Sequence, residues 1–238
     1  MLYQLREGQR SFAQPLSDWA QSMFKLYGNP HSLLSYMPFS NNIAAGFELL
    51  HRMGKEYAKP PFDLPETVID GHQVPVTEKV VVDKPFCKLI RFERHLPPSL
   101  QQHADDPVVL IVAPLSGHHA TLLRDTVRAM LPDNQVYITD WVDARSVPIS
   151  HGPFHLHDYI AYVIEFIRHL GPDVHLVSVC QPTVPVLAAV SIMATIDDPK
   201  QPLSMTMMGG PIDTRKSPTE VNNLATNHSF EWFKMNVI

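Results

Sequence analysis

The residues with the clearest chemical potential are Ser178-Val179-Cys180-Gln181-Pro182. They follow a predicted strand and precede a predicted helix, and proline suits the first turn of a helix. A thiol at a helix N-terminus has its thiolate favoured by the positive end of the helix dipole, and a neighbouring histidine would activate it further. Cys180 is therefore a candidate nucleophile. A buried structural cysteine at a strand end is the alternative.

The elements around this motif predict how it is held. Strands alternate with helices from Pro107 onward, and this order favours a parallel sheet with right-handed crossovers. The predicted strands cover residues 107–113, 135–141, 174–179 and 204–208, and the predicted helices cover residues 123–131, 154–170 and 182–195.

Two of these helices carry specific expectations. Residues 154–170 are predicted to turn one apolar face inward, formed by Leu156, Ile160, Val163, Ile167 and Leu170. Residues 182–195 are apolar around nearly the whole circumference, which predicts a helix buried on all sides.

The N-terminal part reads as helical, followed by a hairpin. Apolar residues recur at three- and four-residue steps on either side of the breaker Gly28-Asn29-Pro30. A Pro-rich joint at 59–65 precedes two predicted strands, 77–82 and 86–92. We therefore expect an N-terminal helical segment with its joint at 1–65, the first part of a core at 66–213, and the start of a cap or insertion at 214–238.

A nucleophile on a strand-to-helix turn, before an apolar helix, is typical of the α/β-hydrolase fold. The motif of that turn is usually G-x-S-x-G, so Ser178 and Pro182 would replace the two glycines. The oxyanion hole of this fold is formed by the backbone N–H after the nucleophile and one from the loop after the first buried strand. These rules predict Gln181 with Leu115 or Ser116. An ordinary turn at 114–119 is the alternative.

Composition narrows the class of protein. Of 238 residues, 45% are hydrophobic and 18% charged, which favours a folded globular chain, and the net charge of -5 gives no reason to expect nucleic acid as a partner. No apolar run reaches the length of a transmembrane helix and the first ten residues contain no secretory h-region, so we expect a cytoplasmic protein. The 13 histidines form no zinc pattern, so neither a metal nor another cofactor is expected. Cys87 is expected to serve packing.

Several motifs together resemble the intracellular polyhydroxybutyrate depolymerases, and the resemblance extends over essentially the whole chain. It implies a thiol esterase acting on amorphous polyhydroxyalkanoate granules in the bacterial cytoplasm, with Cys180 as the nucleophile of a Cys-Asp-His triad. The motifs are Met1-Leu2-Tyr3-Gln4-Leu5, Ala113-Pro114-Leu115-Ser116-Gly117-His118, Thr139-Asp140-Trp141, the stretch 143–154 and Ser178-Val179-Cys180-Gln181-Pro182.

The resemblance also implies that the acid and histidine of the triad lie beyond Ile238. We therefore expect an α/β-hydrolase sheet truncated before its final strands, a chain that hydrolyses poorly, and poor solubility from an uncovered sheet edge. Asp213 and His228 are weaker candidates for the two missing roles. A polyhydroxyalkanoate synthase-like acyltransferase and a non-catalytic granule-binding fragment remain as alternative functions. The oligomeric state stays open.

Overall fold

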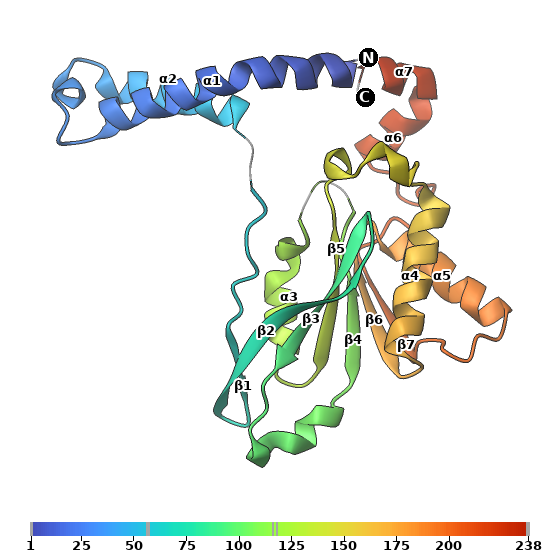
Figure 1. Ribbon diagram of the computed structural model, residues 1–238. Coiled ribbons are helices and arrows are strands. Elements are labelled where there is room, and N and C mark those ends of the chain that lie inside the picture. Colours follow the sequence, from blue (N-terminus) through green and yellow to red (C-terminus); the bar gives the residue numbers. More distant parts are fainter. Residues whose placement is uncertain (1, 56–57, 116, 118, 237–238) are drawn as a thin grey trace. The chain divides into compact units, whose positions relative to one another are not determined.

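The computed structural model describes residues 2–55, 58–115, 117 and 119–236 (Figure 1). The chain forms two compact units. One consists of Lys59–Asp213, and the other of Met1–Ala58 with Thr214–Ile238. The domain boundaries expected at 65/66 and 213/214 stay predictions.

The unit Lys59–Asp213 is built on one sheet of seven strands in the order β1-β2-β3-β5-β4-β6-β7. The strands are β1 (Glu66–Ile69), β2 (His72–Asp83), β3 (Cys87–Arg94), β4 (Val108–Val112), β5 (Gln135–Trp141), β6 (Val174–Val179) and β7 (Ser204–Met208). The helices of this unit are η2 (Pro98–Asp105), η3 (Ala120–Leu123), α3 (Arg124–Met130), η4 (Ala144–Ser146), η5 (Ile149–His151), α4 (Leu156–Leu170) and α5 (Thr183–Thr195).

Strand directions confirm the predicted fold class. β5, β4, β6 and β7 are parallel neighbours, and β1, β2 and β3 add to them by antiparallel pairing. β4 therefore lies between β5 and β6, although both follow it in the chain. This mixed sheet with crossover helices, and with a sharp strand-to-helix turn after β6, is the α/β-hydrolase fold.

Alternating side chains of the parallel strands serve two separate cores. In β4, Val109 and Ile111 pack with Val127 of α3 on one face of the sheet. Leu110 and Val112 pack on the other face, in a core that α4 and α5 also enter. Both faces of the central strands are thus covered, which explains the near-continuous apolar run in their sequence.

Two expectations about helices are wrong. Leu156, predicted inward, begins α4 and is 58% exposed, whereas Tyr159 and Phe166 are buried. The other four predicted residues do face the core, since Val163 and Ile167 are buried and Ile160 and Leu170 are partly buried against it.

The second wrong expectation concerns α5. Its buried residues are Thr183, Pro185, Val186, Ala189 and Met193, while Ile192 is 44% exposed. One face packs against α4 and β6, and the exposed residues show that the remaining face is not buried. The sequence also failed to predict β1, because its burial alternates while its residue types do not: Thr67 is buried and Val68 is exposed.

The second unit contains the predicted N-terminal helices. They are α1 (Leu2–Gly28) and α2 (Ser40–Gly54), with η1 (Leu33–Tyr36) between them, and the C-terminal residues add α6 (Glu220–Asn227) and α7 (Phe230–Asn236). As predicted, α1 ends at Gly28, before Pro30. Ala20 and Ala44 are buried where α1 and α2 pack together, because small side chains allow close approach of the two helices.

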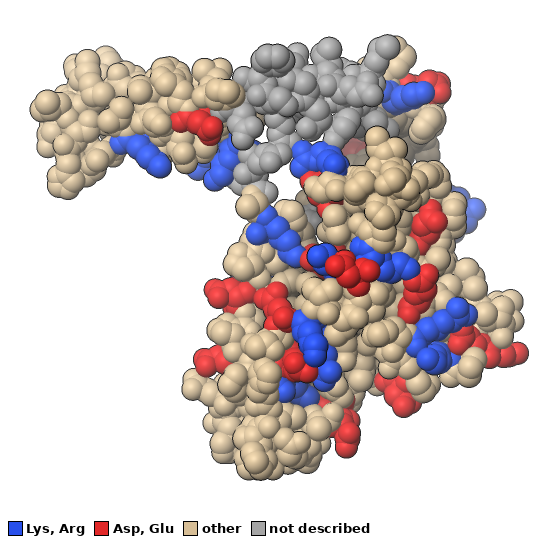
Figure 2. Space-filling model, viewed as in Figure 1, with Lys and Arg blue, Asp and Glu red and all other residues tan. Residues whose placement is uncertain are grey.

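Acidic and basic side chains are interspersed over the sheet-containing unit on the face that Figure 2 shows. Several of them pair between distant parts of the chain, as Lys59 does with Asp140, Lys84 with Glu165, and Arg168 with Asp198. Each pair keeps at least one partly exposed side chain, so solvent weakens the attraction, although Asp198 itself is buried.

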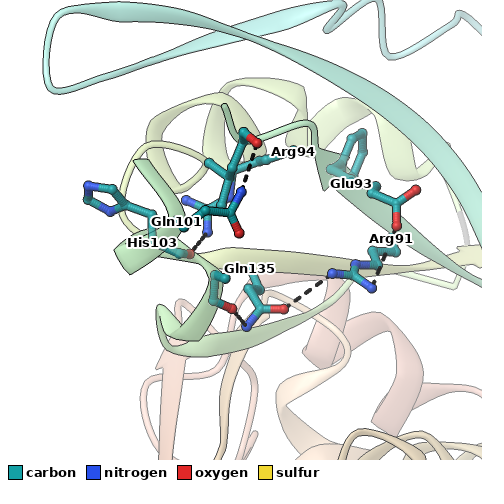
Figure 3. Close-up of a pocket in the computed structure, with 9 residues that line it drawn as sticks. Arg91, Glu93, Arg94, Gln101, His103 and Gln135 are labelled. Atoms are coloured by element: carbon teal, nitrogen blue, oxygen red, sulfur yellow. Dashed lines mark hydrogen bonds and ion pairs between the residues drawn. The ribbon is translucent and has the colours of Figure 1, made fainter. Parts of the chain in front are cut away.

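One cation of this unit is different because it is buried. The side chain of Arg94 is 4% exposed and donates to Asp106 Oδ2 at 2.9 Å and to the carbonyls of Leu131, Pro132 and His103. Figure 3 shows Arg94 and His103 beside a pocket of about 200 Å³. The guanidinium thereby joins β3 to η2 and to the residues that follow α3.

We predict that Arg94→Met lowers the free energy of unfolding by about 3 kcal/mol, because the substitution leaves a carboxylate and three carbonyls without their buried donor. The change is measured as a lower urea midpoint at an unchanged slope. Arg91→Met is the matched control, since the Arg91 side chain is 34% exposed and its ion pair with Glu93 is long at 3.9 Å. Its cost should stay below about 1 kcal/mol. An equal loss of free energy of unfolding in the two variants would show that the buried hydrogen bonds of Arg94 do not stabilise the fold.

Candidate active site

The turn between β6 and α5 holds Cys180 in a strained conformation. Its φ is +66°, in the left-handed region that costs a non-glycine residue about 1–2 kcal/mol. The backbone N–H of Cys180 donates to the carbonyl of Met208 at 2.8 Å. Its carbonyl accepts from the N–H of Thr183 at 3.2 Å and from Thr183 Oγ1 at 2.8 Å. These bonds hold the turn, and the Cys180 side chain is exposed.

Small residues let neighbouring backbones approach this turn, as the elbow motif requires. Ser178 is fully buried in β6 and its hydroxyl donates to the carbonyl of Thr206 in β7 at 3.3 Å. On the other side, a Cβ built on Gly210 would overlap the side chain of Thr183. Gly210 therefore allows the chain leaving β7 to cross the start of α5, and the Gly209-Gly210 pair was the sequence signal for it.

Two of the predicted oxyanion-hole residues are brought together by the fold. The backbone N–H of Leu115 donates to Gln181 Oε1 at 3.1 Å, across 66 positions of sequence. Leu115 follows β4 and Gln181 follows β6, and these strands are adjacent in the sheet. Ser116, the third predicted residue, lies outside the described residues. In this structure the Leu115 donor is thus engaged by the side chain of the residue next to Cys180.

The start of the loop that carries Leu115 is anchored at Ala113. The N–H of Ala113 donates to Thr139 Oγ1 at 2.9 Å, and its carbonyl accepts from Trp141 Nε1 at 2.9 Å and from the Tyr159 hydroxyl at 3.3 Å. Burial raises the pKa of Tyr159 well above its ordinary value, so the phenol remains a donor. The sequence analysis did not identify Thr139, Trp141 and Tyr159 as the residues that anchor Ala113. The signal available for the first two was that hydrogen-bonding side chains end the apolar strand at 139–141.

A cavity of about 320 Å³ adjoins Leu115 and Gln181. Most of its lining is apolar, and among the described residues that line it His155 supplies an imidazole. At the start of α4, the backbone N–H of His155 donates to Asp158 Oδ2 at 2.7 Å. The lining residues are Leu115, Phe154, His155, Leu156, Tyr159, Gln181, Val184, Pro185 and Pro211. A short aliphatic acyl group suits a cavity of this character and size.

Cys87, the second cysteine, has no access to solvent. Its side chain is fully buried in β3, and burial raises the pKa of its thiol well above the ordinary value. It packs with Leu89 and Tyr137 in the core that covers one face of the sheet. The prediction that Cys87 serves packing is confirmed.

The two weaker candidates for the acid and the base lie in different units. Asp213 is the last residue of the unit that contains Cys180. His228 belongs to the other unit, where its ring stacks on Trp232 with centroids 3.9 Å apart. Neither residue gains support for a triad role from these positions.

Within the described part of the chain, no group of three or more His, Cys, Asp or Glu side chains is arranged to hold a metal ion. Over the same residues, no helix combines the length and the apolar character needed to cross a bilayer.

Comparison with known proteins gives one family match. Residues 209–238 match the family described as PHB de-polymerase C-terminus, where PHB is polyhydroxybutyrate. The resemblance to polyhydroxybutyrate depolymerases is thereby confirmed for this segment, which contains Gly210 and both C-terminal helices. A search of curated protein sequences finds no match.

Solved structures with a similar arrangement are hydrolases. An α/β-hydrolase enzyme from the metagenome of Lake Arreo, Spain, is 12% identical, with a TM-score of 0.43, over 89% of this chain and 63% of its own. A hormone-sensitive lipase from a metagenome library is 13% identical, with a TM-score of 0.41, over 88% and 62%. The thioesterase domain from the curacin biosynthetic pathway is 18% identical, with a TM-score of 0.41, over 63% and 50%. The chain thus spans one half to under two thirds of the length of these proteins, and similarity at this level carries no argument about activity.

The contrast between the two thiols predicts selective labelling. Iodoacetamide should alkylate Cys180 in the native protein and leave Cys87 unmodified until denaturant is added, because the thiolate reacts and only Cys180 is accessible. Peptide mass spectrometry measures the two sites separately. Cys180→Ala should abolish native labelling and Cys87→Ala should leave it unchanged. Equal native labelling of both thiols would contradict the burial of Cys87.

Proposed function

We propose that this protein hydrolyses ester bonds of poly(3-hydroxybutyrate), with Cys180 as the nucleophile, because residues 209–238 match the family described as PHB de-polymerase C-terminus. The observation that carries the proposal is the left-handed turn that exposes Cys180 between β6 and α5. In an α/β hydrolase this position is reserved for the nucleophile, and the strain of the turn keeps the side chain clear of the backbone.

The proposed reaction proceeds through an acyl-thioester. The Cys180 thiolate attacks the ester carbonyl carbon, a C–S bond forms, and the C–O bond to the alcohol breaks. The departing alkoxide takes up, through solvent water, the proton that the Cys180 thiol lost when it became a thiolate, and leaves as the hydroxyl end of the remaining polymer. Water then attacks the thioester, releasing 3-hydroxybutyrate or its oligomer as the acid and restoring the thiol.

The backbone N–H groups of Gln181 and Leu115 are proposed to hold the negative oxygen that develops during both steps. Their support comes from the fold, which places the loop after β4 beside the residue after Cys180 through the bond between Leu115 N and Gln181 Oε1. The substrate oxygen would then replace Gln181 Oε1 as the partner of the Leu115 N–H group.

The cavity beside Gln181 is proposed to take the acyl side of the scissile ester. Its volume of about 320 Å³ lies at the small end of ligand pockets, consistent with a hydroxybutyryl unit and less so with a long acyl chain. The alcohol side of the polymer would leave toward solvent. We propose that the substrate is the surface of amorphous storage granules in the cytoplasm.

A covalent adduct tests the nucleophile directly. Incubation with p-nitrophenyl 3-hydroxybutyrate should release p-nitrophenolate and leave a hydroxybutyryl group on the Cys180 peptide, identified by mass spectrometry, because acylation requires only the thiolate and the oxyanion hole. Cys87→Ala should form the same adduct. An adduct that persists in Cys180→Ala would refute Cys180 as the nucleophile. Acyl transfer to Cys180 from hydroxybutyryl-CoA but not from esters would favour a synthase instead.

The side chain of Gln181 gives a second prediction. Gln181→Ala retains the backbone N–H but removes the oxygen that occupies the Leu115 donor, which substrate must otherwise displace. The second-order rate of Cys180 acylation should rise by roughly fivefold, corresponding to about 1 kcal/mol for one exchanged hydrogen bond. Gln181→Glu should lower that rate, because a carboxylate accepts more strongly from the same N–H. A slower reaction in both variants would mean that the Gln181 amide organises the loop rather than competing with substrate.

A further inference from the structure

The turn that joins α1 to α2 exposes large apolar side chains. Leu33 is 89% exposed, Tyr36 80% and Phe39 77%. All three lie within residues 29–39, which we call the docking turn, at the closed end of the helical pair (Figure 1). Single exposed apolar residues are ordinary, but a cluster of this kind on a short segment marks an interaction surface.

The backbone of the docking turn is largely satisfied from within. The N–H groups of Ser32 and Ser35 donate to the carbonyls of Asn29 and Ser32 at 2.9 and 3.1 Å. Ser40, the first residue of α2, donates from its hydroxyl to the carbonyl of Ser35 at 2.7 Å. A segment that enters an apolar phase must leave few polar backbone groups unpaired, since each costs several kcal/mol there. The docking turn comes close to meeting that requirement.

The docking turn is held on a rigid support. Trp19 and Phe47 pack edge-to-face with centroids 5.2 Å apart, and Tyr27 lies 5.9 Å from the same Phe47 ring. The hydroxyl of Ser17 donates to the carbonyl of His51 at 3.0 Å across the two helices. These contacts fix the ends of α1 and α2 relative to each other, so the apolar side chains between them are presented without much loss of entropy on binding.

The absence of charge indicates the kind of partner. No Lys, Arg, Asp or Glu occurs from Leu26 to Phe47, a stretch of sequence that contains the whole docking turn. On the face that Figure 2 shows, the closed end of the helical pair carries neither charged colour. Anionic lipid surfaces recruit clusters of Lys and Arg, and charged protein partners recruit complementary charges. A turn without Lys, Arg, Asp or Glu fits an uncharged surface.

We propose that the docking turn inserts Leu33, Tyr36 and Phe39 into the surface of amorphous poly(3-hydroxybutyrate). This inference rests on the proposed function for the identity of the polymer. The ester-rich polymer is uncharged, and the Tyr36 hydroxyl already donates to the carbonyl of Pro30 within the turn at 3.3 Å, so its burial leaves that donor paired. Docking through this turn is independent of the chemistry at Cys180.

The test is co-sedimentation of the full chain with amorphous poly(3-hydroxybutyrate) granules. The triple variant Leu33→Ser, Tyr36→Ser, Phe39→Asn should bind at least roughly tenfold more weakly, because three apolar side chains no longer leave water. Asn is chosen at position 39 because Phe39 has a φ of +62°, a conformation that asparagine tolerates. Binding by the wild type should persist at high salt, since no charge is involved.

A matched control removes three exposed apolar side chains from the other unit. Val68→Thr, Ile196→Ser and Leu203→Ser together should leave granule binding unchanged. The single variant Leu33→Ser changes the most exposed of the three positions and should lower granule binding by roughly threefold or more. It keeps the proposal testable if the triple variant fails to fold. Circular dichroism should show the same helix content in all variants.

Other occupants give different results. Binding to phosphatidylglycerol vesicles that exceeds granule binding and disappears with salt would overturn the proposal in favour of an anionic lipid surface. An oligomer that the triple variant converts to monomers, without loss of granule binding, would identify the turn as a contact between copies of the chain. Acylation of Cys180 by the soluble ester should be equal in wild type and triple variant. If neither protein is acylated while the wild type still binds granules more tightly than the triple variant, the proposed function alone is refuted. If granule binding is unchanged in the triple variant, the docking turn alone is refuted.

Discussion

Cys180 adopts a left-handed backbone at the junction of β6 and α5, and the rest of the site is arranged around that turn. A non-glycine residue persists in this conformation only where its surroundings over-determine it. Here one hydrogen bond comes from the end of β7, through Met208, and two come from Thr183 in the first turn of α5. The close passage of Gly210 over Thr183 belongs to the same arrangement. Strand β7 thus stabilises the turn, besides extending the sheet beyond β6.

The second half of the site depends on a different set of contacts, centred on Ala113. Its backbone is held by Thr139 and Trp141 from β5 and by Tyr159 from α4, so the loop after β4 leaves the sheet at a defined point. The loop then reaches Gln181 through Leu115. β4 lies between β5 and β6 in the sheet. Residues of β5 therefore anchor the end of β4, and the loop after β4 lies beside the turn after β6. This is the physical reason that the two halves of a proposed oxyanion hole, 66 positions apart, meet.

The helical pair differs from the sheet-containing unit in where its large apolar side chains lie. In the central strands of the sheet, apolar side chains are covered on both faces, and even Arg94 is buried with its hydrogen-bonding partners. In the turn between α1 and α2 the backbone is largely paired internally while the large side chains remain outside. Chemistry at Cys180 and attachment to a polymer surface would thus be carried by separate parts of the chain, and each can be changed without the other.

Local patterns in the sequence were enough to place β5, β6 and β7, to end α1 at Gly28, and to single out Cys180 between a strand and a helix. They sufficed because side-chain periodicity and the preferences of proline and glycine act over a few residues. They failed at α5, where an apolar circumference did not show which face would be covered, and at α4, where the buried stripe includes Tyr159 rather than Leu156. The sequence by itself therefore determined the fold class and the candidate nucleophile. Only the tertiary structure decided that Gln181 engages Leu115 and that Thr139, Trp141 and Tyr159 anchor Ala113, because strand order brings those residues together and no local periodicity encodes that order.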